Sequence, residues 1–165
     1  STGFDAASIN TTPAHTLDLT SGSGLTGSIQ CGTVSDDGKY IYMNQSSTIY
    51  QWTLSTPFSL SSASYTRSQS GFNTAGWDSM CKISPDGTQL ITHNNSYSSG
   101  QNSFSSYELT TAWDISTKVH QKTVNLHDKV PHAPILVHSA GWTIANKSWY
   151  FNPYYNYCSL QIDFT

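Results

Sequence analysis

Short runs of alternating apolar and polar residues recur along the whole chain. Alternation at every second position places apolar side chains on one face of a β-strand. Gly, Pro, Asn, Asp and Ser, which favour turns, separate the runs, and none of the runs has a convincing helical period. The pattern therefore predicts an all-β protein. The expected strands cover residues 16–20, 29–34, 40–43, 48–54, 65–69, 79–84, 89–92, 105–109, 118–124, 134–137, 142–145, 148–151 and 159–164.

Two of the turns between these strands carry an Asp-Gly pair. Residues 35–40 read SDDGKY and residues 84–89 read SPDGTQ, and each stretch lies between two expected strands. Asp-Gly is a strong hairpin signal because glycine accepts the positive φ that a tight turn requires. We therefore expect Gly38 and Gly87 to adopt left-handed conformations.

The hairpins belong to a longer repeat. Residues 54–61 read LSTPFSLS and residues 109–116 read LTTAWDIS, so that the two stretches align residue by residue. Residues 161–165, QIDFT, align a third time with the stretch QWTLS at residues 51–55. Self-similarity at a fixed period is the signature of a repeat architecture.

The repeat divides one 165-residue domain into three copies. The copies cover residues 21–69, residues 70–124, and residues 125–165 together with residues 1–20. The second copy is longer than the first, and we expect its extra residues to form a polar loop at 94–102. In the third copy, Gly141 is expected to take the place of the turn glycine.

Four short antiparallel strands with an Asp-Gly hairpin are typical of one blade of a β-propeller. We therefore predict a small β-propeller-like domain of three four-stranded antiparallel repeats. The third copy stops at residue 165, where a further motif is due, and the chain begins with STGFD. We expect residues 16–20 to pair with residues 159–164, so that a shared strand joins the two ends and leaves no bare sheet edge.

The joined motifs ISPDGT at residues 83–88 and LTTAWDIS at residues 109–116 resemble the propeller-type repeats of bacteriophage appendage proteins and other virion-surface proteins. The resemblance covers nearly the whole chain, through three copies that become progressively less similar. It implies a virion structural protein, a phage decoration protein, fibre or tail appendage. Such a protein is made in the host cytoplasm and located at the virion surface in multiple copies, in contact with other virion structural proteins. Closed single-chain propellers typically have at least four blades, so monomeric closure and a strand-swapped oligomer both stay open.

The composition excludes some partners. Only 10% of the residues are charged and the net charge is −3. A surface of this kind lacks the basic footprint that nucleic acid or an anionic membrane attracts. Since no apolar run approaches the length of a membrane span, we expect no membrane insertion. The odd set of cysteines, Cys31, Cys81 and Cys158, does not suggest a disulfide framework, and we interpret Cys31 and Cys81 as small buried apolar residues.

The titratable residues match no catalytic or metal-binding motif. Asp36, Asp37 and Asp86 fall in hairpin turns without the spaced carboxylates of a calcium loop. Glu108 is the only glutamate, which leaves little support for the paired carboxylates of glycoside hydrolysis. The spacing of the clustered histidines fits no zinc motif. These histidines are His120, His127, His132 and His138. We therefore expect no metal, no cofactor and no enzymatic activity.

The stretch WYFNPYYNY at residues 149–157 is the densest aromatic feature of the chain. Tyr and Trp combine a broad apolar face with a polar tip, which suits protein interfaces and the faces of sugar rings. The candidate binding residues are Trp149, Tyr150, Tyr154, Tyr155 and Tyr157. The alternative is that these rings fill a core where three blades meet.

The sequence leaves three functions to compare. The first is a non-enzymatic virion structural protein that displays a propeller-like adhesion domain. The second is a carbohydrate-binding, lectin-like propeller that binds a host-surface glycan, although the aromatic stretch occurs in one copy only. The third is a glycan-degrading enzyme, which the shortage of carboxylates disfavours.

Overall fold

The computed structural model describes the backbone of residues 15–74, 79–96, 101–125, 137–143, 148–153 and 160–162, and side chains within 15–74, 79–94 and 103–125. These residues form antiparallel sheets and 3-10 turns, and the described ranges contain no α-helix. No helix among them is long and apolar enough to cross a membrane. The all-β class predicted from the alternation is therefore confirmed.

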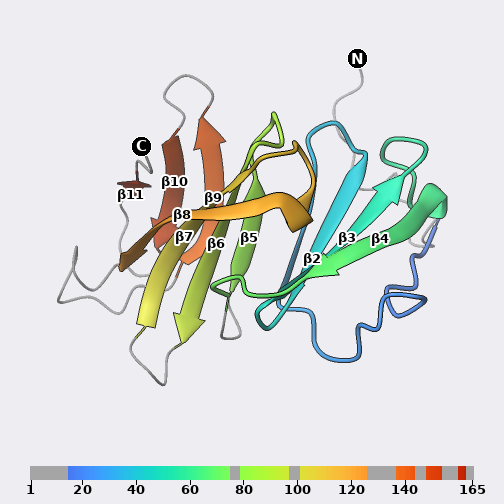
Figure 1. Cartoon of the computed structure of the whole chain (residues 1–165), viewed down its shortest axis with the longest axis horizontal. Coiled ribbons are helices and arrows are strands. Elements are labelled where there is room, and N and C mark those ends of the chain that lie inside the picture. The colour runs from blue at the N-terminus through green and yellow to red at the C-terminus, as the bar shows by residue number, and fades with distance from the viewer. Residues whose placement is uncertain are drawn as a thin grey trace, which may run out of the picture.

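Three sheets follow one another along the chain. The first sheet has the order β1-β2-β3-β4, the second sheet β5-β6-β7-β8, and the third sheet β11-β10-β9. Figure 1 shows the second sheet between the other two. The strands are β1 (Cys31–Val34), β2 (Tyr40–Gln45), β3 (Thr48–Leu54), β4 (Ala63–Gln69), β5 (Met80–Ile83), β6 (Gln89–Ser96), β7 (Gln101–Leu109), β8 (Lys118–Asn125), β9 (Val137–Thr143), β10 (Ser148–Pro153) and β11 (Leu160–Ile162).

The first and second sheets each have a register shift and a 3-10 turn at equivalent positions. The register of β3 against β4 shifts between Gln51 and Trp52, and that of β7 against β8 shifts at the equivalent position, between Ser106 and Tyr107. A bulge increases the local twist of a strand. Each sheet also has a 3-10 turn before its fourth strand, η2 (Leu60–Ser62) and η4 (Ile115–Thr117). The two sheets therefore repeat the same local geometry.

Two apolar clusters stabilise the first sheet, one on each face. The cluster between the first and second sheets consists of Tyr42, Ile49, Phe72, Cys81, Ile83, Leu90, Tyr107, Leu109 and Ile115. The cluster on the opposite face consists of Leu25, Ile41, Trp52 and Leu54, with Leu17 and Leu19 packed against it. The adjacent residues Ile41 and Tyr42 enter different clusters, because successive strand side chains point to opposite faces.

The predicted strand at residues 16–20 and the predicted ring closure are wrong. Residues 16–20 form coil and bends, because Asp18 Oδ1 accepts hydrogen bonds from the backbone N–H of Thr20 (2.9 Å) and from its hydroxyl (2.7 Å). Leu17 and Leu19 pack on the first sheet instead. Within the described residues, β11 pairs with β10 alone, and Figure 1 shows the three sheets in an open row.

Two further expectations are corrected. Gly141 is not in a turn but inside β9, opposite Tyr150 of β10. Of the residues expected in a polar loop at 94–102, residues 94–96 and 101–102 extend the β6–β7 hairpin, where Asn94 pairs with Ser103, while residues 97–100 lie outside the described residues. Backbone pairing in a ladder satisfies N–H and C=O groups whatever the side chain is, so a polar stretch of Asn and Ser can lengthen two strands.

Candidate functional site

The structure places part of the aromatic segment at residues 149–157. Trp149 and Tyr150 lie in β10, where Trp149 is opposite Trp142 of β9 and Tyr150 is opposite Gly141. The other candidate binding residues lie outside the described residues. These are Tyr154, Tyr155 and Tyr157. The binding role of the five residues stays a prediction.

Both Asp-Gly turns adopt one hydrogen-bonded geometry. Gly87 has φ of 71°, and its N–H donates to the carbonyl of Ser84 at 2.9 Å. The Ser84 hydroxyl donates to Asp86 Oδ1 at 2.6 Å. Gly38 has the same φ, and the equivalent bonds are repeated in the first turn by Ser35, Asp37 and Gly38. The left-handed conformations predicted for both glycines are confirmed.

The turn carboxylates are held charged by their own turns. Partial burial tends to raise the pKa of Asp86, but hydrogen bonds from Ser84 and Thr88 bring that pKa below its ordinary value. In the first turn, burial is likewise outweighed by the hydrogen bond from Ser35, which lowers the pKa of Asp37. Hydrogen bonds to a carboxylate favour the charged form, so both turns are stabilised at neutral pH.

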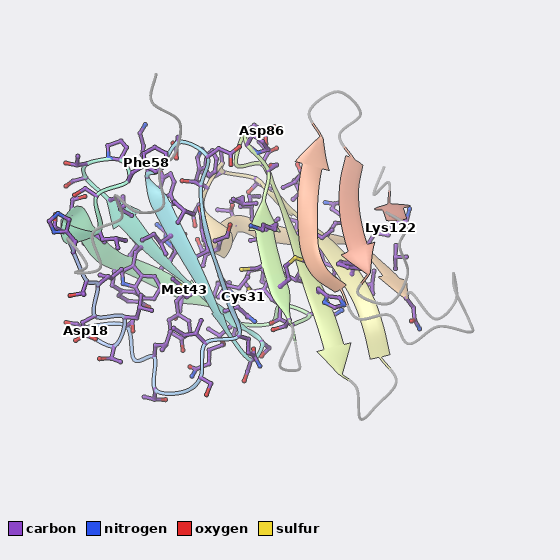
Figure 2. All side chains as sticks on the ribbon, turned by 180° about the vertical axis from the view of Figure 1, so that it is seen from behind. Asp18, Cys31, Met43, Phe58, Asp86 and Lys122 are labelled. Atoms are coloured by element: carbon purple, nitrogen blue, oxygen red, sulfur yellow. The ribbon has the colours of Figure 1, made fainter. Side chains whose placement is uncertain are left out.

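An aromatic ring covers each turn glycine. The backbone N–H of Trp113 donates to the carbonyl of Gly87 at 2.8 Å, and a Cβ added to Gly87 would lie 2.3 Å from ring atom Cδ2. Phe58 covers Gly38 in the same way, with an N–H···O distance of 2.9 Å and a ring atom 2.5 Å from the added Cβ. We call each pair, Phe58 with Gly38 and Trp113 with Gly87, a glycine clamp. Figure 2 shows Phe58 and Asp86 at the same edge of the molecule.

The clamp aromatics are themselves in an unusual backbone conformation. Phe58 has φ of 61° and Trp113 has φ of 70°, a region that costs a non-glycine residue about 1–2 kcal/mol. Such a conformation persists only where the surroundings hold it. Here the hydrogen bond to the glycine carbonyl supplies that support at both residues, and the stacking of the Trp113 ring on Tyr40 adds to it in the second clamp. The two motifs of the repeat, the Asp-Gly turn and the stretch that contains Phe58 or Trp113, are therefore in direct contact in the folded protein.

The second clamp is also the point where the first sheet docks. The Trp113 ring stacks on Tyr40, with centroids 5.6 Å apart and an interplanar angle of 12°. The backbone carbonyl of Trp113 accepts hydrogen bonds from the Tyr42 hydroxyl and from Gln51 Nε2, both at 2.9 Å. Tyr42 is 0% exposed and Gln51 3% exposed. Because buried polar groups are costly unless paired, these bonds fix how the two sheets pack.

An ion pair adds a second connection at the rim of this contact. The Arg67 guanidinium on β4 donates to Asp114 Oδ1 at the start of η4, and to Ser116 Oγ at 3.0 Å. Partial burial raises the pKa of Asp114, but hydrogen bonds from Ser116 and Arg67 bring it below its ordinary value. The pair is partly exposed to solvent, so its contribution is modest.

A group of buried polar side chains forms hydrogen bonds around Asn44, at the end of β2 away from Tyr40. Asn44, which is 0% exposed, donates through Nδ2 to Ser79 Oγ at 2.9 Å and to Gln30 Oε1 at 3.1 Å. Its Oδ1 accepts from the Thr74 hydroxyl at 3.0 Å. These bonds attach Thr74 and Ser79, which lie between β4 and β5, to the first sheet.

The first clamp lacks the cover that the second clamp has. Phe58 is 69% exposed, whereas the equivalent Trp113 is half-buried against Tyr40. Leu60 is 38% exposed, whereas the equivalent Ile115 is fully buried. The first sheet therefore presents at its rim the apolar positions that the second sheet buries.

The titratable residues that suggested metal or acid–base chemistry are dispersed. His120 bonds the Thr123 hydroxyl at 2.9 Å, and Glu108 accepts from Gln121 Nε2 at 3.0 Å. His138 lies in β9, while His127 and His132 lie outside the described residues. Within the described part of the chain, no three His, Cys, Asp or Glu residues come together as a metal site would need.

Sequence reasoning missed two features that the structure reveals. One is the contact inside each glycine clamp, which the joint recurrence of the Asp-Gly turn and the Phe or Trp could have suggested. The other is the proximity of Cys31 and Cys81, whose sulfur atoms are 3.3 Å apart, and for which the sequence carries no signal. The chain matches no protein-family model and no curated protein.

Proposed function

We propose that the chain is a non-enzymatic structural protein of a virion surface, in which three propeller-like repeats carry an adhesion surface. The observation that carries this proposal is that polar side chains of the first two sheets connect these sheets to each other. Gln51, Arg67 and Asp114 are residue types that serve binding and catalysis in enzymes, and here they connect one sheet to the next. Such connections favour a rigid scaffold.

The propeller-like part of the proposal rests on how the first two sheets meet. The first strands of the two sheets, β1 and β5, contact each other through the sulfur atoms of Cys31 and Cys81. On the side of the fourth strands, Arg67 of β4 reaches η4, which precedes β8. Radially arranged blades pack in this manner. We propose that the third sheet is a further, shorter blade of the same series, in an arc that other chains of the particle complete.

The adhesion surface is proposed to be the aromatic segment, with Trp149 and Tyr150 in β10 and Tyr154, Tyr155 and Tyr157 beyond it. Trp and Tyr dominate the energetic centres of protein interfaces. Many copies on one particle would turn weak individual contacts into firm attachment through effective concentration. The same surface suits a host-surface glycan, because sugar rings also stack on aromatic faces.

The proposal is tested on particles purified by density gradient from a lysate of the phage that encodes the chain. Quantitative mass spectrometry should find the chain in a fixed ratio to the major capsid protein, and the ratio should survive a high-salt wash. A chain found only in the soluble fraction would overturn the virion assignment.

A glycan array with the purified chain separates adhesion to particle proteins from adhesion to sugars. Binding to a defined glycan that is lost in a Tyr154→Ser and Tyr155→Ser double variant would support the lectin-like function. A matched control is Val119→Ser, which removes an apolar side chain that is 46% exposed on β8. Cleavage of any glycan by the purified chain would contradict the non-enzymatic function.

A further inference from the structure

Two cysteines from different sheets meet at the centre of the molecule. Cys31 begins β1 and Cys81 lies in β5, and their sulfur atoms are 3.3 Å apart although the residues are 50 positions apart in the chain. Figure 2 shows Cys31 on the side of the first sheet that faces β5. The repeat does not account for this pair, because alignment of the Asp-Gly turns places Cys31 opposite Met80 and Cys81 opposite Gly32.

The pair is asymmetric in exposure and in hydrogen bonding. Cys31 is half-buried, whereas Cys81 is 1% exposed. The two Sγ atoms lie within hydrogen-bond distance of each other, and the Cys81 backbone N–H donates to Cys31 Sγ at 2.9 Å. The hydrogen bond from Cys81 lowers the pKa of Cys31, with burial opposing and the nearby Lys82 assisting. The same bond, together with burial, raises the pKa of Cys81.

We propose that Cys31 and Cys81 are a redox-active dithiol that closes to a disulfide between the first and second sheets. Bond formation requires the sulfur atoms to approach each other by only about 1.3 Å, to the usual S–S length of about 2.0 Å. The oxidant we name is a low-molecular-weight disulfide of the glutathione type.

The reaction proceeds by two thiol–disulfide exchanges. The Cys31 thiolate attacks one sulfur of the small disulfide, forming a mixed disulfide and releasing one small thiolate, which takes up a proton. The sulfur of Cys81 then attacks Cys31 Sγ, the bond between Cys31 and the small thiol breaks, and the Cys81 proton passes to the departing small thiolate, which leaves as the second small thiol. Two protein thiols are thereby oxidised by two electrons, and one small disulfide is reduced to two thiols.

The exposure difference fixes the order of the two steps. The small disulfide can reach Cys31, which is half-buried, and cannot reach Cys81, which is buried. Cys31 is therefore the attacking residue and Cys81 the resolving residue. A bond at this point would connect β1 to β5 covalently and close a loop that contains the whole of the first sheet.

The test uses the full chain with Cys158→Ser, which removes the third thiol. The protein is incubated with oxidised glutathione, unreacted thiols are alkylated, and the products are analysed by intact mass and by peptide mapping without reduction. We expect the alkylatable thiols at positions 31 and 81 to disappear together and one linked peptide pair to form. In the same background, Cys81→Ala should stop at a stable glutathione adduct on Cys31, and Cys31→Ala should leave Cys81 unreacted.

Three outcomes would overturn the proposal. They are a persistent glutathione adduct without a linked pair, a faster reaction at Cys81 than at Cys31, and no reaction at either thiol under conditions that oxidise dithiothreitol. Far-ultraviolet circular dichroism of every variant tests whether the fold is intact. If a Cys→Ala variant loses the native spectrum, the time course of the Cys158→Ser protein decides, because sequential closure requires the mixed disulfide to appear before the linked pair.

Discussion

The glycine clamp makes a sharp prediction for Gly87→Ala. Gly87 has φ of 71°, and an added Cβ would lie 2.3 Å from Trp113 Cδ2. The Trp113 ring has little freedom to move away, because it stacks on Tyr40 and the Trp113 backbone N–H is bonded to the Gly87 carbonyl. The substitution therefore introduces two separate costs, one from the backbone and one from the ring.

The two costs can be given magnitudes. A left-handed conformation costs a residue with a Cβ about 1–2 kcal/mol, and overpacking against a fixed group adds about 1–3 kcal/mol. Gly87→Ala should therefore lower the free energy of unfolding by about 2–5 kcal/mol. In a Trp113→Ala background, only the backbone cost remains. The coupling energy between the two sites should then be about 1–3 kcal/mol.

Gly22→Ala is the matched control for the backbone cost. Gly22 has the same φ of 71°, and no atom lies within 4 Å of an added Cβ. The assay is urea unfolding followed by far-ultraviolet circular dichroism, which does not depend on the removed tryptophan. Equal destabilisation by Gly87→Ala and Gly22→Ala, or an undiminished cost of Gly87→Ala in the Trp113→Ala background, would refute the clamp.

Three further predictions concern charge and attachment. Arg67→Ala should lower the free energy of unfolding by about 1 kcal/mol or less, because the ion pair with Asp114 is partly exposed. Arg67→Lys should not restore the lost stability, since one ammonium cannot reproduce the guanidinium contacts with both Asp114 and Ser116. Thermal melting of both variants tests this prediction, and full rescue by lysine would contradict it. Because hydrogen bonds lower the pKa of Asp86 in the folded state, its stabilisation is present above the ordinary carboxyl pKa and is lost as the pH falls through the lowered value. Unfolding curves between pH 7 and pH 2 should therefore converge for the parent chain and Asp86→Asn at the acid end, and curves that stay parallel would contradict this. The double variant Tyr154→Ser and Tyr155→Ser should release the chain from particles, by roughly 2 kcal/mol or more per ring if both are central to the interface, without changing the melting temperature of the isolated chain; a variant that unfolds would assign these rings to a core.

Local signals in the sequence predicted the features that depend on neighbouring residues. The alternation around Ile41 and Trp52 located two strands, and the Asp-Gly pairs located two hairpins with left-handed glycines. These features are set by backbone conformation and by the period of a strand. The conformation of Gly38 and Gly87 could therefore be predicted before any contact was known.

Features that depend on distant contacts could not be predicted in this way. Residues 16–20 alternate like a strand, but Asp18 binds the backbone of Thr20 and bends the chain, while the leucines pack on the first sheet. Gly141 has the surroundings of a turn glycine, yet it pairs within β9. The closeness of Cys31 and Cys81 arises from the stacking of two sheets, which no local pattern records.

The central claim is that the first and second sheets form one rigid unit joined through the Trp113 carbonyl. Native-state hydrogen exchange of the full chain, read by mass spectrometry of peptides from β3 and β7, tests it most directly, with Gln51→Ala as the perturbation. Gln51 donates to that carbonyl at 2.9 Å from a buried position, so its removal weakens the connection and not either sheet alone. We expect the protection of β3 and β7 to be equal in the parent chain and to fall by the same factor in the variant. Protection that differs between the two strands in the parent, or that falls in β3 while β7 is unchanged, would contradict the account.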